Sequence, residues 1–313
     1  MIAWLEESSP NAALLGGKGL NLGRLAQQGL PVPPAFVVTT EAYEAAVFRD
    51  DDILGLLREL DTAAEENIPA LAHALRESIR RLALPPSLEE GIRSAYLRLS
   101  PHREPVAVRS SATAEDTASA SFAGQQDTYL GVLGGDEVAQ RIRDCWASAY
   151  TDRAVVYRRR HGFDHGSIAV AVVVQRLVDA EKAGVMFTVN QVTQARSQVC
   201  IEACWGLGEA LVSGTVNPDH FVVDKRSGEI AEHYILPKRE MIVRVAGTVQ
   251  VSSVPVALER VHQPVLDAGE IQRLTDMANR VEAYFGSPQD IEWAIQGGSV
   301  YLLQSRPVTT LKS

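Results

Sequence analysis

Lys18 lies among glycines in the segment LLGGKGLNLG, residues 14–23, and a helix-like pattern follows it. Backbone N–H groups at a helix start, together with a nearby ammonium group, bind the oxygens of a phosphate chain. The segment departs from the P-loop pattern, because Ala12 occupies the position of its first glycine and Gly19 follows the lysine. We therefore predict a phosphate contact at Lys18 that is not of the Walker type, with a solvated glycine-lysine turn as the alternative.

Three other segments carry weaker signals of related chemistry. In VAVRSSATAED, Arg109 leaves an apolar strand into hydroxyl groups that could cap a helix or contact phosphate. In SFAGQQDTYL, Gly124 lies in a polar turn of small residues that could close over phosphates as a flap. In VVVQRLV, an apolar strand becomes polar at Gln175, and such strand ends often lend backbone groups to an adenine edge. An ordinary core strand is the alternative for the last segment.

The segment QDIEWAIQGGSVYLLQSRP, residues 289–307, predicts a hairpin that turns at glycines 297 and 298. A two-residue loop would place Glu292 opposite Leu303, whereas a three-residue loop with a glycine bulge would place Glu292 opposite Gln304, and we predict the second register. The apolar face is expected to hold Ile291, Trp293, Ile295, Tyr301 and Leu303, and the polar face Glu292, Gln304 and Arg306. A metal and a phosphate could bind to that polar face, and a half-exposed strand pair is the alternative.

The elements that must position these groups follow from apolar periodicity and from glycine and proline positions. We predict one helix that ends at Gly29 and three or four helices over residues 41–100, with breaks near 50–52, 67–69 and 84–87. Two further helices are predicted over residues 135–161 and 267–285. Strands are expected from residue 105 around a small-residue loop, and over 167–255 with hairpin turns at 225–229 and 245–250. The last helix should begin near Asp267 and end at Gly286.

Length, composition and charge limit the classes of protein to which this chain could belong. With 313 residues and 46% apolar composition, the chain can bury a large core in one domain or in two lobes that share a cleft. The longest apolar run, SIAVAVVVQRLV, is shorter than the about 20 residues that cross a bilayer, and the N-terminus does not read as a signal peptide. We therefore expect a cytoplasmic protein without a membrane partner. A net charge of −9 argues against nucleic acid, and the three cysteines are expected to be reduced and buried.

Each signal is weak alone, but their order along the chain is specific. The phrases GGKGLNLGRLAQQGLPVPPAF, VRSSATAED, ASFAGQQDTYL, AGVMFT, GLGEALVSGTVNPD and QDIEWAI…LLQSRPVTT resemble the N-terminal ATP-binding domain of the phosphoenolpyruvate synthase and pyruvate phosphate dikinase family. FAGQQDTYL and TDRAVVYRRRHGFDH are most similar to its antibiotic-inactivating branch, rifampin phosphotransferase. The resemblance extends from about residue 10 to residue 311.

The resemblance implies an α+β, ATP-grasp fold with two lobes that enclose a nucleotide cleft. The lobes would be residues 1–170, with a helical insert and phosphate-binding loops, and residues 171–313, with the adenine strand and the metal-binding hairpin. The site residues that it implies are Lys18 and Arg109 for the phosphates, Gly124 and Thr128 for the flap, Gln175 and Leu177 for adenine, Glu292 and Gln304 for Mg²⁺, and Arg306 for the phosphate chain. Lys18, Arg109 and Arg306 would be the catalytic residues.

Family members cleave ATP to AMP and phosphate, and the β-phosphate passes through a histidine on a swivelling domain to pyruvate or to a hydroxyl of rifampin. The seven histidines of this chain are scattered, lack metal-ligand spacing and lack the Thr/Ser-rich, Gly-rich setting of that histidine, so we expect them to be structural. The expected partners are therefore a phosphohistidine domain, in the same chain or a separate one, and an acceptor-binding domain. One departure from the family is Asn190, which stands where the family usually has aspartate.

Two other functions remain open at this point. An ATP-dependent carboxylate ligase with the same fold would form an acyl phosphate and ADP instead of AMP. A non-catalytic, nucleotide-binding regulatory subunit would bind ATP without turnover, and Asn190 is the sequence feature that favours it. A neutral change at a strand-to-turn position is the alternative for Asn190.

Overall fold

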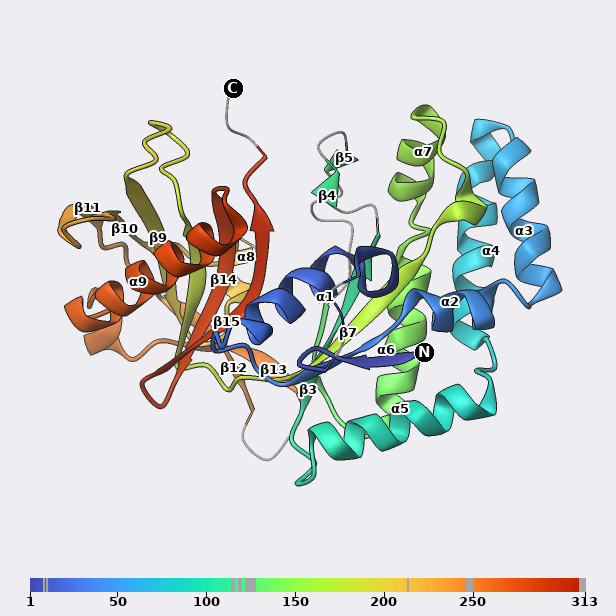
Figure 1. The fold of residues 1–313 in the computed structure, drawn as a ribbon, viewed down its shortest axis with the longest axis horizontal. Coiled ribbons are helices and arrows are strands. Elements are labelled where there is room, and N and C mark those ends of the chain that lie inside the picture. The colour runs from blue at the N-terminus through green and yellow to red at the C-terminus, as the bar shows by residue number, and fades with distance from the viewer. Residues whose placement is uncertain are drawn as a thin grey trace. The chain divides into compact units, whose positions relative to one another are not determined.

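The protein was analysed as a computed structural model, which mixes helices and sheets as the sequence predicts (Figure 1). The structure describes residues 1–309 apart from 8, 10, 114–115, 118–119, 122–127, 213 and 246–249. The predicted flap residue Gly124 lies outside the described residues. The chain forms two compact units, the first made of residues 1–27 and 34–177 and the second of residues 28–33 and 178–313. The division predicted between residues 170 and 171 falls inside a strand that belongs wholly to the first unit.

The first unit contains a five-stranded antiparallel sheet in the order β1-β2-β7-β3-β6. Its strands are β1 (Ile2–Trp4), β2 (Ala35–Val38), β7 (Val170–Arg176), β3 (Val106–Ala112) and β6 (Thr128–Val132). A separate pair, β4 (Asp116–Thr117) and β5 (Ala120–Ser121), follows β3. Strands β1 and β2 are not among the predicted elements, because they are short and carry no alternation of apolar and polar residues.

Helices cover both faces of this sheet. Helix α1 (Ala12–Gln27) contacts β7 and β3 on one face. The core lies on the other face, where Phe36, Val108 and Val172 pack with apolar side chains of the remaining helices, Tyr43 and Trp146 among them. Those helices are α2 (Thr40–Val47), α3 (Asp51–Thr62), α4 (Ile68–Arg81), α5 (Pro86–Leu99), α6 (Gly135–Ser148) and α7 (Asp152–Arg160).

The four helices from α2 to α5 confirm the predicted breaks in residues 41–100. The helix predicted over 135–161 is wrong as a single element, because it is interrupted between α6 and α7. Thr151 caps the start of α7, where its side-chain oxygen accepts from the Ala154 N–H at 3.4 Å. Threonine competes with the helix backbone for hydrogen bonds, so it favours such an N-terminal position over a helix interior.

The second unit contains a six-stranded antiparallel sheet in the order β11-β10-β9-β8-β14-β15. Its strands are β11 (Ile230–Tyr234), β10 (Asp219–Asp224), β9 (Gln198–Trp205), β8 (Lys182–Phe187), β14 (Gln289–Gln296) and β15 (Ser299–Pro307). Strands β12 (Glu240–Arg244) and β13 (Val251–Pro255) form a separate hairpin, and α8 (Glu209–Val212) is a single turn. The hairpins predicted near 225–229 and 245–250 are therefore confirmed.

Helix α9 (Ala268–Phe285) lies along one face of this sheet and contacts β14 and β9 (Figure 1). It begins and ends as predicted: Asp267 and Glu270 form a reciprocal capping box, and Gly286 is left-handed with φ 70°. Its buried apolar stripe faces Ile291 and Trp293 of β14, which are fully buried. The opposite face of β14 carries Glu292, which is only half-buried.

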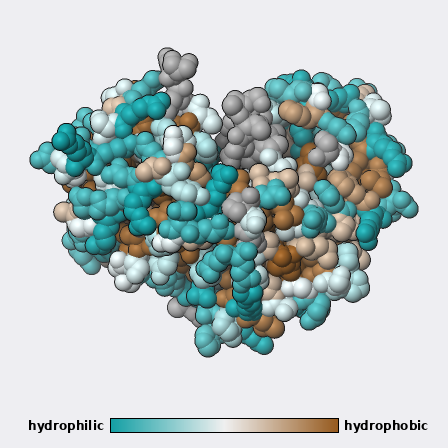
Figure 2. All heavy atoms as spheres, viewed as in Figure 1, coloured by the Kyte–Doolittle hydropathy of each residue, from teal (hydrophilic) through white to brown (hydrophobic). Residues whose placement is uncertain are grey.

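The visible surface carries mainly hydrophilic residues with scattered hydrophobic ones (Figure 2). In the part of the chain that the structure describes, no helix combines the length and apolar character needed to span a bilayer. The three cysteines are buried thiols, as predicted.

Candidate functional site

Ser111 joins the glycine-lysine segment to β3 in the first unit. Its hydroxyl donates to the Leu15 carbonyl at 2.9 Å and accepts from the Gly19 N–H at 3.0 Å. The ammonium group of Lys18 donates to the Ser110 carbonyl at 3.1 Å. Two segments separated by 92 residues, each a weak signal alone, are therefore adjacent in the fold.

Gly16 makes the close approach of the glycine-lysine segment to β3 possible. Its backbone is left-handed, with φ 68°, and interrupts α1, so that Lys18 lies in the first turn of the helical stretch that follows. A Cβ atom at Gly16 would lie 2.0 Å from the Ser111 carbonyl oxygen. The glycine-lysine segment is thus the start of a helix and not a solvated turn, and a helix start favours the binding of an anion.

Arg109 and two other predicted residues lie on the face of the first unit's sheet that α1 covers. Arg109 is 9% exposed and is the cross-strand partner of Thr128 on β6. On β7, Val173 pairs with Arg109, so Gln175 projects to the same face two residues further along. Gln175 is 1% exposed, and its side-chain Nε2 finds no hydrogen-bond partner among the described residues. A buried amide donor without a partner is costly, so this atom is suited to a bound acceptor.

Arg109 occupies a different position in its strand from the one predicted. It lies inside β3, which continues to Ala112, and does not leave the strand. The strand extends because β3 pairs with β7 over its whole length. Gln175 lies at the end of a strand as predicted, since it is the penultimate residue of β7, and Leu177 follows that end and donates its N–H to the Pro105 carbonyl at 3.1 Å.

The β14–β15 hairpin places Glu292 directly opposite Gln304, as predicted. The predicted cause is wrong. The loop has two residues, Gly297 and Gly298, because Gln296 pairs with Ser299, and both glycines have positive φ, as the favoured two-residue turn requires. The extra residue is Leu303, a bulge between the Trp293–Leu302 and Glu292–Gln304 pairs.

The bulge changes which side chains share a face. Paired residues of antiparallel strands point to the same side, so Tyr301, the partner of Ala294, lies on the face of Glu292. The predicted placement of Tyr301 and Leu303 on the apolar face is therefore wrong. Both instead pack against a small apolar cluster, which consists of buried Val178, Ala183 and Ala294 with half-buried Ala180, Tyr301 and Leu303.

Arg306 is held beside the Glu292–Gln304 pair by Asp290, its cross-strand partner. The guanidinium donates to one carboxylate oxygen of Asp290 through Nε at 2.8 Å, and Nη2 lies 2.7 Å from the same oxygen. Burial raises the pKa of Asp290, and the negative charges of Glu292 and Glu202 raise it further. The Arg306 guanidinium lowers the pKa of Asp290 and so opposes this rise. Asp290 is not among the residues predicted for the site, although its position two residues before Glu292 on a strand indicates that it shares the same face.

The chemistry of this pair fits Mg²⁺. Glu292 and Gln304 offer a carboxylate and an amide oxygen from adjacent strands, and hard cations prefer oxygen ligands. Among the described residues, no group of three or more His, Cys, Asp or Glu side chains is arranged for a metal. Mg²⁺ does not require such a group, because it commonly takes one or two carboxylates and completes its shell with phosphate oxygens and water.

Asn190 has a structural role in the turn after β8. Its side-chain oxygen accepts from the N–H groups of Val192 and Thr193 at 3.0 and 3.1 Å, and its Nδ2 donates to Gln198 at 2.9 Å. Asparagine commonly organises turns in this way. These bonds favour the neutral strand-to-turn interpretation of this position.

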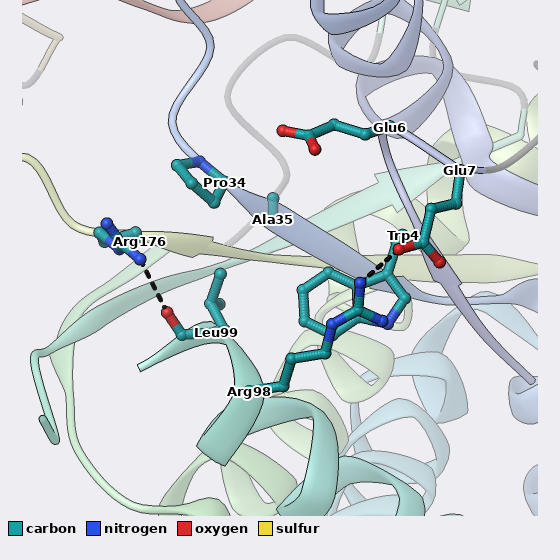
Figure 3. A pocket seen from close by; sticks show the side chains of 8 residues that line it. All are labelled: Trp4, Glu6, Glu7, Pro34, Ala35, Arg98, Leu99 and Arg176. Atoms are coloured by element: carbon teal, nitrogen blue, oxygen red, sulfur yellow. Dashed lines mark hydrogen bonds and ion pairs between the residues drawn. The ribbon is translucent and has the colours of Figure 1, made fainter. Parts of the chain in front are cut away.

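A pocket of about 160 Å³ lies in the first unit, apart from the predicted residues (Figure 3). Arg98 stacks on Trp4, with 4.0 Å from its guanidinium carbon to the ring centre, and pairs with Glu7. At the other end, Arg176 donates to the Leu99 carbonyl at 3.1 Å. None of the predicted site residues is among those that line this pocket.

Comparison with known proteins identifies relatives over nearly the whole chain. Residues 12–313 match the family described as pyruvate phosphate dikinase, AMP/ATP-binding domain. A probable phosphoenolpyruvate synthase from Methanocaldococcus jannaschii is 44% identical over 321 residues, which cover 99% of this chain and 27% of that protein. The phosphoenolpyruvate synthase of Pyrococcus furiosus is 40% identical over 358 residues, which cover 99% of this chain and 44% of that protein.

A rifampicin phosphotransferase from Streptomyces sviceus is 43% identical over 311 residues, which cover 98% of this chain and 35% of that protein. The chain therefore spans less than half the length of these curated relatives. Among solved structures, a D-alanine–D-alanine ligase from Bacillus anthracis aligns with 93% of this chain and 56% of its own, at 7% identity and a TM-score of 0.36.

Proposed function

The chain belongs to the family of pyruvate phosphate dikinase AMP/ATP-binding domains, and on that premise we propose that it binds Mg²⁺-ATP as the nucleotide domain of a dikinase-type phosphotransferase. The proposal includes the ATP-grasp fold. In the reaction, ATP gives AMP and phosphate, and the β-phosphate passes to a histidine on another domain or chain and then to an acceptor such as rifampin or pyruvate. The much greater length of the relatives supports the need for further domains.

The direct opposition of Glu292 and Gln304, with Arg306 beside them, is the observation that supports this proposal most strongly. These two side chains would hold Mg²⁺, which neutralises phosphate charge when bound. Arg306, fixed by Asp290, would orient the phosphate chain. A fixed guanidinium loses less entropy on binding than a mobile one, so Asp290 would be a positioning residue.

In the first unit, Lys18 and Arg109 would bind phosphate oxygens, and the helix start after Gly16 would add backbone N–H donors. Thr128, the partner of Arg109, would line the flap together with Gly124. Gln175 and Leu177 would hold adenine, for which the Nε2 of Gln175, without a partner among the described residues, is a suitable donor. Catalysis of this kind depends on positioning and on stabilisation of charge rather than on a covalent role for these side chains.

Product analysis tests the proposal. The full chain is supplied with Mg²⁺ and ATP, alone and with a histidine-bearing domain of a longer family member, and AMP and ADP are quantified. We expect AMP only when that domain is present, and a loss of about 100-fold or more in Arg109→Ala and in Glu292→Ala. Control variants are Arg93→Ala in the first unit and Glu282→Ala in the second, which remove ion pairs away from the proposed site.

The other products have definite meanings. ADP as the product would instead indicate the carboxylate ligase. Tight ATP binding without any product, even with the histidine domain present, would indicate the regulatory subunit. Equal losses in the control variants would remove the support for the proposed residues.

A further inference from the structure

His220 lies in the same cross-strand row as the proposed metal ligands of the second unit. The row runs through directly opposed residues of neighbouring strands: Gln304, Glu292, Val185, Glu202, His220 and Tyr234. Directly opposed residues in an antiparallel sheet share a face, so all six side chains lie on the side away from α9. Neighbouring strands are about 4.8 Å apart. The His220 backbone is therefore about 14 Å from the Glu292 backbone, and the Glu202 backbone is about 10 Å from it.

Glu202 and His220 form a pair on this face. The imidazole Nδ1 lies 3.8 Å from a carboxylate oxygen of Glu202, and both side chains are 32% exposed, so a ligand on the sheet can reach them. Hydrogen-bond and charge interactions with Cys200 and then with Glu202 raise the pKa of His220 to about 9, against the opposing effect of burial. From β11, the Tyr234 ring lies 6.2 Å from the imidazole between ring centres and is tilted by 38°, and the Tyr234 hydroxyl donates to Glu232 at 3.4 Å. These interactions favour the imidazolium form at this position of the face.

The remainder of the face indicates which part of a nucleotide the cation would meet. The apolar cluster around Ala294 and Tyr301 lies one step along β14 from Glu292, and Val178 of that cluster directly follows Leu177 in the chain. A flat apolar group suits the cluster, and a metal-bound phosphate suits Glu292 and Gln304. His220 lies three strands across the sheet from Glu292 in the same row, so a phosphate chain that leaves the cluster and turns along this row would reach it.

We propose that His220, oriented by Glu202, contacts the terminal phosphate of the bound nucleoside triphosphate and thereby distinguishes ATP from ADP and AMP. This inference rests on the proposed nucleotide site. Imidazolium donates a charge-assisted hydrogen bond to phosphate, and Glu202 would hold the ring in place through its other edge. From the sequence, all seven histidines are expected to be structural, and nothing near position 220 indicates that strand pairing brings this residue into line with Glu292.

Calorimetric titration of the full chain with ATP, ADP and AMP in the presence of Mg²⁺ tests the proposal. For His220→Gln we expect ATP binding about tenfold weaker, with ADP and AMP unchanged within about twofold. His220→Lys keeps a cation and should retain most of the preference for ATP. Unchanged AMP binding in both variants also shows that the fold is intact.

The pH dependence provides a second readout. In the wild type, the ratio of ATP to AMP affinity should fall as the pH rises through about 9, because the imidazolium loses its proton. Glu202→Gln should move this fall to lower pH, and His220→Lys should not show it near pH 9. Three results for His220→Gln would each overturn the proposal. They are equal weakening of the binding of all three nucleotides, equal weakening of the binding of ATP and ADP, and no change in binding.

Failure of this inference is distinguishable from failure of the proposed function. If the wild type binds ATP, and Glu292→Ala weakens that binding while His220→Gln does not, only the role of His220 is wrong. If the wild type does not bind ATP, or Glu292→Ala has no effect, the nucleotide site itself is wrong.

Discussion

Glu292 of β14 and Gln304 of β15 are directly opposed because Leu303 bulges from β15 between them and the two-residue turn. The turn requires left-handed backbone at Gly297 and Gly298, with φ 56° and 74°. Changing both glycines to alanine should lower the free energy of unfolding by about 2–4 kcal/mol, since each L residue in that region costs about 1–2 kcal/mol. Urea denaturation measures this loss. Gly297→Asn is the control, because asparagine tolerates the turn, and an equal loss there would contradict the explanation.

Gly16 should tolerate no side chain. In Gly16→Ala the added Cβ would overlap the Ser111 carbonyl at 2.0 Å and the backbone would be strained at φ 68°, so we expect a loss of at least about 2 kcal/mol in unfolding free energy. Gly23→Ala in the same helix is the matched control. Its nearest neighbour would be at an ordinary 3.6 Å, and alanine favours helix, so the protein should be unchanged or more stable by up to about 1 kcal/mol. Similar stabilities of the two variants would argue against the close approach.

Asp219, the first residue of β10, directly precedes His220 and forms a buried ion pair with Lys238. Asp219 also accepts from the N–H groups of Leu236 and Val265 at 3.2 and 2.7 Å. Lys238→Met leaves a buried carboxylate without its cation and should cost about 3–5 kcal/mol in thermal or urea unfolding. Arg81→Met removes an exposed pair and should cost no more than about 1 kcal/mol. Comparable losses of unfolding free energy in the two variants would mean that the buried pair stabilises the protein no more than an exposed pair does.

Protonation of His220 should stabilise the folded protein. Its folded pKa of about 9 lies above the ordinary 6.5, so the folded state binds the proton more tightly than the unfolded chain. This contribution is fully present below about pH 6.5 and is lost as the pH rises through about 9. Urea unfolding from about pH 6 to about pH 10 should show this decline in the wild type but not in His220→Gln. An identical pH profile in the two proteins would refute the assignment.

Asn190 should not limit nucleotide chemistry. Asn190→Asp keeps the oxygen that accepts from Val192 and Thr193, and loses only the donor to Gln198. We expect a stability loss of about 1 kcal/mol, with AMP formation alongside the histidine domain within about twofold of the wild type. A marked gain in AMP formation would instead show that the missing carboxylate positions the metal.

Local patterns predicted the elements whose boundaries are set by their own residues. Asp267, Glu270 and Gly286 define α9 through hydrogen bonds and backbone freedom within one turn of each end. The breaks among the helices over residues 41–100 were also predictable from proline and polar residues. Strands β1 and β2 were not, because they are only three and four residues long and depend on pairing with each other and with β7.

The sequence by itself determined the kinds of chemistry available: glycines around Lys18, an arginine followed by hydroxyls, and a hairpin with a carboxylate, an amide and a guanidinium. Those properties belong to residue types and to short spacings. Only the tertiary structure decided that Ser111 joins the segments of Lys18 and Arg109, that Leu303 bulges so that Tyr301 changes face, and that His220 lies in line with Glu292. Such neighbours depend on strand order and register, which are fixed by the burial of whole sheet faces and not by any local spacing.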